Sequence, residues 1–124
     1  MKKYIIVCGL LFLSACGNED IKNSVKTCMN DIATKPNEAL FDKCFYYENE
    51  FQRQLSINFE NILPKLFDNY GGINDIEVEI LNKNEKSAKV QIITKFKNGF
   101  VKSEKRNMIK FDNIWKMSAE IIKD

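Results

Sequence analysis

The sequence has no histidine among its 124 residues, and it has only two prolines and five glycines. Without histidine the chain cannot form Ser-His or Cys-His nucleophilic pairs, imidazole metal sites or the usual charge switch near neutral pH. It also has no large excess of one charge, since 19 basic residues stand against 17 acidic ones, and this gives no support to nucleic acid binding. We therefore expect no cofactor, no metal site and no catalytic activity.

Long apolar runs are also missing, apart from one at the N-terminus. Met1-Lys2-Lys3 is followed by ten mainly apolar residues, from Tyr4 to Leu13. This is about half the length that a helix needs to cross a bilayer, roughly 20 residues. A basic start, a short apolar run and small residues after it indicate a secretory signal. The alternative is a buried N-terminal helix, which would place Lys2 and Lys3 beside the core.

The apolar run ends in Leu13-Ser14-Ala15-Cys16. This motif resembles the lipobox of bacterial lipoproteins, in which a leucine and two small residues precede an obligatory cysteine. The resemblance implies that residues 1–15 are a signal peptide and are removed. It also implies that Cys16 receives a diacylglyceryl group on sulfur, and usually an acyl chain on its amine. Two or three acyl chains hold a protein at a membrane far more firmly than one.

The same resemblance implies a place in the cell. In Gram-negative bacteria an aspartate after the lipidated cysteine commonly retains the protein at the inner membrane. This chain has Gly17 there, which favours the outer membrane and its periplasmic face. We expect residues 16–21 to be a lipidated N-terminus with a short polar tether, and residues 22–124 to be a single domain. Without residues 1–15 the chain carries 17 basic and 17 acidic residues, because the removed part holds Lys2, Lys3 and no acid.

Two cysteines remain in the expected domain, Cys28 and Cys44. The first lies on the apolar face of an expected helix with Ile21, Val25, Met29 and Ile32, and the second lies on a shorter helix with Leu40, Phe41 and Phe45. Pro36 separates the two helices, and Asn37 can cap the second. An exported chain favours a disulfide between such facing cysteines. The alternatives are two buried thiols, or a metal or redox site that has no C-x-x-C motif to support it.

A third helix is predicted from Glu50 to Tyr70, with a kink or break at Pro64 and with Gly71 as its left-handed cap. Its apolar residues repeat every 3.6 positions and are expected to face the core. They are Phe51, Leu55, Phe59, Ile62, Leu63, Leu66, Phe67 and Tyr70.

After Gly72 the apolar period changes to two, which predicts four antiparallel strands at about 73–80, 88–96, 100–111 and 114–122. Two-residue turns at Asn98-Gly99 and Asp112-Asn113 would leave the apolar residues of the last two strands on opposite faces. A bulge within Ser103–Asn107, or a longer turn, would remove the conflict. The alternative is a polar inner patch in a sheet cavity. It would consist of Thr94, Ser103, Lys105 and Asn107.

The order of elements resembles small bacterial lipoproteins with a domain like nuclear transport factor 2, a cone-shaped fold also called cystatin-like. The resemblance rests on the helices followed by Gly71-Gly72-Ile73, on Lys97-Asn98-Gly99 and on Ile114-Trp115-Lys116-Met117. It implies an α+β domain in which a helical hairpin and a long helix pack on a curved antiparallel sheet of about four strands. Catalytic members commonly use an Asp-His pair in a pocket, and no such residues carry over because the chain has no histidine.

These observations favour a membrane-anchored envelope lipoprotein whose domain binds a protein or a small ligand without catalysis. One alternative is a pocket enzyme of the same fold that uses carboxylates or tyrosines. Its candidate residues are Glu48 and Glu50 beside Tyr46-Tyr47, although acids also favour an ordinary helix start. A second alternative is an exclusion or immunity lipoprotein of the kind that phages and plasmids carry.

Overall fold

The computed structural model describes the backbone of residues 2–121 and the side chains of residues 18–119. Two helices come first, α1 (Lys2–Thr34) and α2 (Glu38–Cys44). Asn37 caps α2, and its side-chain oxygen accepts a hydrogen bond from the backbone N–H of Leu40 at 2.8 Å. The predicted cap is therefore confirmed. Asn18, Glu19 and Asp20, which were expected in the tether, already belong to α1.

The predicted third helix is two helices, α3 (Glu50–Glu60) and α4 (Leu63–Asn69). Pro64 lies in the first turn of α4, where its missing N–H is not needed, so the break falls just before it. Gly71 follows α4 with φ +82°, as expected for a left-handed cap. A glycine is required there because a side chain would be strained at this φ.

The sheet has five strands in the order β1-β5-β4-β3-β2. Four are the predicted antiparallel strands, β2 (Ile73–Lys83), β3 (Ser87–Phe96), β4 (Val101–Phe111) and β5 (Ile114–Ile121). The fifth is the short β1 (Phe45–Tyr46), which pairs in parallel with β5. Sequence analysis placed Phe45 on the second helix. That helix ends at Cys44, and Phe45 is extended with φ −120° and buried.

Two-residue turns would have placed the apolar residues of β4 and β5 on opposite faces of the sheet. The turn before β4 is longer than that, and this removes the conflict. Between β3 and β4 the backbone N–H of Phe96 donates to the oxygen of Phe100 at 2.9 Å, which leaves a turn of the three residues Lys97-Asn98-Gly99, and Gly99 has φ +93°. This loop suits a three-residue hairpin that ends in a left-handed glycine. Lys95 therefore pairs with Val101, and the pairing runs without interruption to Ser87 and Ile109. The expected bulge within Ser103–Asn107 is wrong for this pair of strands. The irregularity lies instead between β4 and β5. There Arg106 pairs with Ile121 and Met108 with Met117, so one residue of β4 lies opposite three residues of β5.

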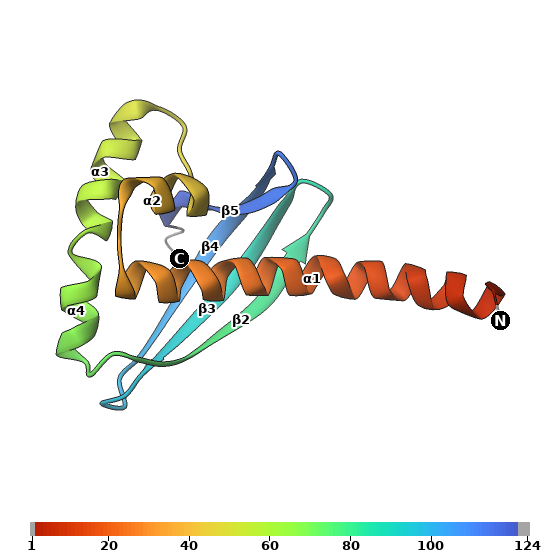
Figure 1. Ribbon diagram of the computed structural model, residues 1–124, viewed down its shortest axis with the longest axis horizontal. Helices are drawn as coiled ribbons and strands as arrows, with labels where there is room; N and C mark the ends of the chain where they lie inside the picture. The colour runs from red at the N-terminus through yellow and green to blue at the C-terminus, as the bar shows by residue number, and fades with distance from the viewer. Residues whose placement is uncertain (1, 122–124) are drawn as a thin grey trace.

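The core lies between α1 and one face of the sheet, with α2 beside α1 and with α3 and α4 at one edge (Figure 1). On the helical side it contains Ile21, Val25, Met29 and Ile32, all at most 8% exposed. The sheet supplies the other side, and its buried members are Ile76, Val78, Ala88, Val90, Ile92, Phe96, Met108, Trp115 and Met117. The part of α1 before residue 18 extends away from this core at the opposite end from α3 and α4. Among the described residues, no helix is both long enough and apolar enough to span a bilayer.

Candidate functional sites

The predicted lipidation site falls outside the part of the chain whose side chains are described. This applies to all of Leu13-Ser14-Ala15-Cys16 and to Gly17. The backbone of these residues belongs to α1, which continues from them into the core at Ile21.

The structure contains the predicted disulfide between Cys28 and Cys44. The Cα atoms are 5.8 Å apart, and both side chains are at most 7% exposed. The bond joins the inner faces of α1 and α2, which are connected by only the short segment at Pro36. It closes a loop with a sequence separation of 16 residues and holds the two helices of the hairpin together.

The predicted inner patch is correct for one of its four residues. Thr94 is 2% exposed and points to the core side of β3. Ser103, Lys105 and Asn107 lie on the outer face instead, because the three-residue turn moves β4 by one position and so reverses its faces. Ser103 shows this directly, since its hydroxyl accepts a hydrogen bond from Gln91 Nε2 at 2.7 Å on the outer face.

The residues that do point inward from β4 are Lys102, Glu104 and Arg106, followed by the apolar Met108. Arg106 is only 6% exposed. Its guanidinium donates to the backbone oxygen of Ser118 at 3.1 Å, lies 3.6 Å from Glu104 Oε2 and stands 5.5 Å from the centre of the Phe45 ring. Arg106 Nε has no hydrogen-bond partner among the described residues. A buried cation with one unused donor is the kind of group that orients a polar ligand.

Glu60, at the end of α3, is the acid of this inner cluster and is also 6% exposed. Burial raises the pKa of Glu60 to about 7, although the nearby charge of Arg106 favours the ionised carboxylate. Glu104 raises the pKa further, and Lys102 lowers it. Glu60 therefore exchanges a proton near neutral pH, which is the range in which a general acid or base is most effective. Nothing in the sequence marked Glu60, because sequence analysis assigned the core-facing side of this helix to its apolar residues.

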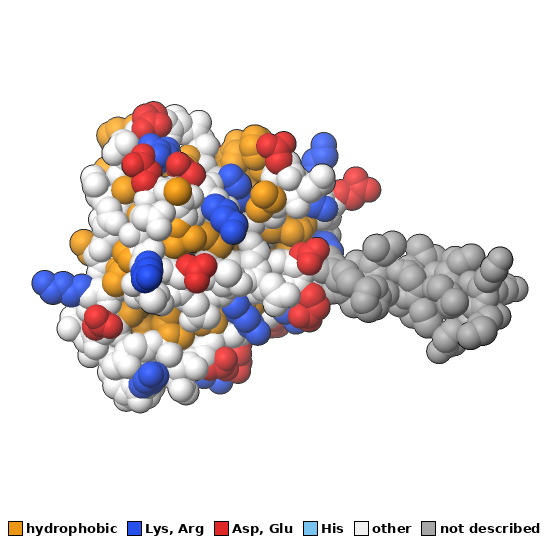
Figure 2. Space-filling view, viewed as in Figure 1, with side chains coloured by type: hydrophobic (Ala, Val, Ile, Leu, Met, Phe, Trp, Pro, Cys, Tyr) orange, Lys and Arg blue, Asp and Glu red, His pale blue; other side chains and the backbone are white. Residues whose placement is uncertain are grey.

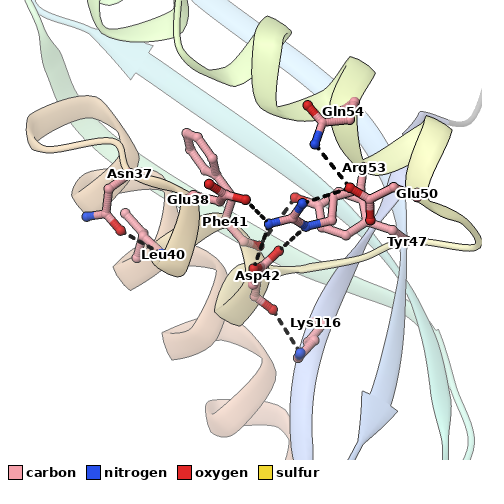
Figure 3. Close-up of polar contacts among 10 residues, drawn as sticks. All are labelled: Asn37, Glu38, Leu40, Phe41, Asp42, Tyr47, Glu50, Arg53, Gln54 and Lys116. Carbon is pink, nitrogen blue, oxygen red and sulfur yellow. Dashed lines mark hydrogen bonds and ion pairs between the residues drawn. The ribbon is translucent and has the colours of Figure 1, made fainter.

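The acids that sequence analysis did select do not form a catalytic pair. Glu50 begins α3, where it accepts a hydrogen bond from Arg53 Nη1 at 3.0 Å. Arg53 also holds Asp42 through two hydrogen bonds of 2.8 and 3.0 Å, and it contacts Glu38 (Figure 3). These bonds lower the pKa of Asp42, with Arg53 as the largest cause. The group is thus a clamp that joins α2 to α3. Tyr47 lies under it and donates to the backbone oxygen of Phe41 at 3.4 Å.

A second feature is the outer face of α3 and α4, which is apolar and exposed. We call it the α3–α4 face, and it consists of Phe51, Leu55, Phe59, Ile62 and Leu66, which are 41–73% exposed. The prediction that this stripe faces the core is wrong for these five residues and correct for Leu63 and Phe67. Hydrophobic side chains are visible at this edge of the molecule in Figure 2. The exposed apolar area is on the order of 500 Å², comparable to the largest patch on a typical monomer, and such patches commonly mark interaction sites.

The described residues contain no group of three or more cysteine, aspartate or glutamate side chains placed to hold a metal ion. The clustered acids are instead paired with Arg53 or with Arg106.

Comparison with known proteins identifies the fold. No protein-family model matches the sequence, and no curated protein matches it either. The structure is similar to the crystal structure of a "Putative NTF2-like transpeptidase" from Campylobacter jejuni, with a TM-score of 0.59 and 17% sequence identity. The similarity covers 76% of this chain and 93% of the other. The domain therefore has the α+β fold of nuclear transport factor 2, as expected. An identity this low shows the fold alone.

Proposed function

We propose that this chain is a lipid-anchored protein of the bacterial cell envelope whose domain binds a partner protein without catalysis. The anchoring rests on the lipobox that ends at Cys16, with Gly17 favouring the outer membrane. The disulfide of Cys28 and Cys44 supports it, because such bonds persist in exported proteins and are rare in the cytosol.

The observation that carries the binding role is the exposed α3–α4 face. Its centre is formed by Leu55, Phe59 and Ile62, and each is about half exposed although each is large and apolar. Folding of this domain alone leaves them in water, which is unfavourable by roughly 25 cal/mol for each Å² of apolar surface. A second protein that covers the face would recover this free energy.

The chemistry of the face indicates what kind of partner fits it. The exposed residues beside it include the neutral amides Gln54, Asn58 and Asn61, with Lys65 and Asp68 exposed on α4. The partner therefore presents an apolar surface with a polar margin, such as an amphipathic helix. The N-terminal part of α1, which would carry the proposed lipid anchor, leaves the domain at the end opposite α3 and α4 (Figure 1).

The anchoring is tested by Cys16→Ser in cells, followed by fractionation and palmitate labelling. The unchanged protein is expected in the membrane fraction with label, and the variant is expected unlabelled, released or unprocessed. A variant that is processed normally and stays with the membrane would contradict the anchoring.

The binding role is tested by a photoreactive amino acid at Leu55, with Lys89 on the open face of the sheet as the control position. We expect one adduct of constant mass at Leu55 and none at Lys89. The protein in that adduct, once purified, should bind the unlabelled domain at least ten times more weakly after Leu55→Asp. An adduct with the mass of a homodimer, or an affinity that Leu55→Asp leaves unchanged, would contradict the proposal.

Glu60 favours a second candidate, an enzyme that uses a carboxyl group in the interior of the fold. Such an enzyme needs Glu60 to be reachable by small molecules. Coupling of carboxyl groups to glycine amide with a carbodiimide, read by peptide mass spectrometry at pH 6, measures this. Modification of Glu60 at a rate near that of the exposed Glu79 would support the enzyme, and the absence of modification in the folded protein would exclude it.

A further inference from the structure

We propose that the tips of the two β hairpins form a surface that rests on the membrane, with Phe111 and Ile114 entering the headgroup region. This inference rests on the proposed lipidation of Cys16. It adds the orientation of the domain and names the face that meets the bilayer, neither of which follows from a lipid anchor alone.

The first observation is the shortness of the link between the anchor and the core. Ile21 is fully buried, and only five positions separate it from Cys16. The backbone is helical throughout this stretch, so it spans only about 7.5 Å at 1.5 Å per residue. A link this short and stiff cannot hold the domain away from the lipid headgroups, so the end of the domain around Asp20 must meet the membrane.

The second observation is what surrounds Asp20. The tips of β2–β3 and β4–β5 lie at the end of the domain where α1 leaves it (Figure 1). Lys83 Nζ is 3.5 Å from Asn18 Oδ1, which ties the β2–β3 tip to the first described turn of α1. Together the tips and α1 surround an open hollow of about 990 Å³. Its lining includes Asp20, Lys83, Lys86, Lys110, Asp112 and Trp115.

The third observation is an exposed apolar pair at the β4–β5 tip. Phe111 and Ile114 face each other across the Asp112-Asn113 turn, and they are 50% and 46% exposed. Lys116 Nζ stands 5.6 Å from the centre of the Phe111 ring. Aromatic residues are typical of the membrane interface, where their rings lie at the level of the headgroups. The ammonium group of Lys116 is held beside the ring by the backbone oxygen of Asp42, to which it donates at 2.8 Å.

The charges around the hollow indicate which lipids this surface accepts. Lys83, Lys86 and Lys110 are matched by the three acids in its lining, Asp20, Glu85 and Asp112. Figure 2 shows both charges near the hydrophobic side chains of this end. Because the lysines and acids balance, attraction to anionic lipid adds little. The surface fits zwitterionic headgroups, in which a phosphate and an ammonium group can meet charges of both signs.

The test uses the processed protein, extracted from membranes with its disulfide intact and reconstituted into phosphatidylcholine vesicles. A nitroxide at Lys86→Cys reports on the proposed surface, and one at Asn58→Cys on α3 is the control. We expect a water-soluble nickel chelate to collide with the label at position 86 at least five times less often than with the label at 58. The ratio should stay within a factor of two when 30% phosphatidylglycerol is added.

A matched pair of double variants shows whether the apolar residues cause this protection. Phe111→Ser with Ile114→Ser should raise the collision rate at position 86 at least twofold, because the tip no longer enters the headgroup region while the short link still holds the domain near it. Phe51→Ser with Leu55→Ser, at the far end of the domain, should leave it protected. If intact mass shows the protein without lipid, the proposed anchoring fails and this inference fails with it. If the protein is lipidated and the label at position 86 is as accessible as that at 58, this inference alone is overturned.

Discussion

Two amphipathic helical regions of this chain have the same apolar period, but the apolar side of one is buried and that of the other is exposed. In α1 the residues Ile21, Val25, Met29 and Ile32 are all buried against the sheet. In α3 the residues Phe51, Leu55 and Phe59 follow the same period and remain in water. The comparison shows that a 3.6-residue period establishes that a helix has an apolar side, whereas burial of that side depends on what the rest of the fold leaves free.

The difference has a structural cause in the position of the helices. The inner face of the sheet is already covered by α1, and α3 lies at the edge of the sheet (Figure 1). The side that α3 turns to the domain carries Arg53, Ile57 and Glu60 rather than its aromatic residues. A helix in that position keeps an apolar side available for another molecule, which is the basis of the proposed binding role.

The largest contrast is expected between Ile21→Ala in α1 and Leu55→Ala in α3. Ile21 is 0% exposed and Leu55 is 55% exposed. Removing the buried side chain should lower the free energy of unfolding by about 2–5 kcal/mol. Removing the exposed one should change it by less than about 0.5 kcal/mol. Urea unfolding of the oxidised protein measures both, and similar losses in the two variants would mean that α3 packs inward.

The next largest effect is expected for the disulfide, which joins α1 to α2 and does not include α3 or α4. Reduction, or Cys28→Ala with Cys44→Ala, should lower the free energy of unfolding by about 3 kcal/mol for a loop of this length. The α3–α4 face should remain as accessible as before, because neither helix is bonded to the disulfide. Denaturant melts with and without reductant measure the loss. A reductant that leaves the denaturation midpoint unchanged would show that the bond is absent.

Glu60, at the end of α3, should make the free energy of unfolding depend on pH. Its folded-state pKa of about 7 lies above the ordinary value of 4.5, so the folded protein binds this proton more tightly than the unfolded chain. The contribution of Glu60 to the free energy of unfolding is most favourable below pH 4.5, declines as the pH rises to about 7 and then stays low. The total change is about 3 kcal/mol.

Glu60→Gln should remove that decline. The variant should be more stable than the unchanged protein at pH 8 by about 2–3 kcal/mol and nearly equal to it at pH 4. Glu79→Gln, at an exposed position on β2, is the matched control and should leave the pH profile as it was. Parallel profiles for Glu60→Gln and the unchanged protein, measured by urea melts between pH 4 and pH 8, would show that Glu60 is solvated.

The smallest effect is expected for Arg53→Met, which removes the clamp between α2 and α3. Arg53 is bonded to acids that are largely in solvent, so its effect should be smaller than that of Ile21→Ala, of disulfide loss or of Glu60→Gln at pH 8, and it should shrink at high salt. The pKa of Asp42 is lowered by this contact, so the stabilisation is present above the ordinary carboxyl range and disappears as the pH falls through the folded-state value. Thermal melts at two salt concentrations measure it, and a large salt-independent loss would mean that the clamp is buried.

Local signals predicted most of this fold. Asn37 capped its helix, Gly71 ended α4 and the pair of cysteines met, because each of these features depends on a few neighbouring residues. The strands were found from their alternation. The register of β4 could not be predicted with certainty, because a turn of two or three residues at Lys97-Asn98-Gly99 decides which face every later residue occupies.

The candidate sites were less accessible to sequence reasoning. Arg106 points inward only because of that turn, and the same change moved Lys105 to the outer face. Glu60 is buried only because α3 turns its apolar side outward, and this depends on contacts between segments far apart in the chain. The lipobox remains a prediction, and it could be proposed from sequence because a short linear motif needs no tertiary structure.

The most direct test of the proposed anchored role is the intact mass of the native protein, extracted from its host without reductant. The proposal predicts a chain that begins at Cys16, carries a diacylglyceryl group with an acyl chain, and is two hydrogens lighter than its reduced form because of the Cys28–Cys44 bond. A chain that still begins at Met1, with an unmodified Cys16 and free thiols at Cys28 and Cys44, would contradict it.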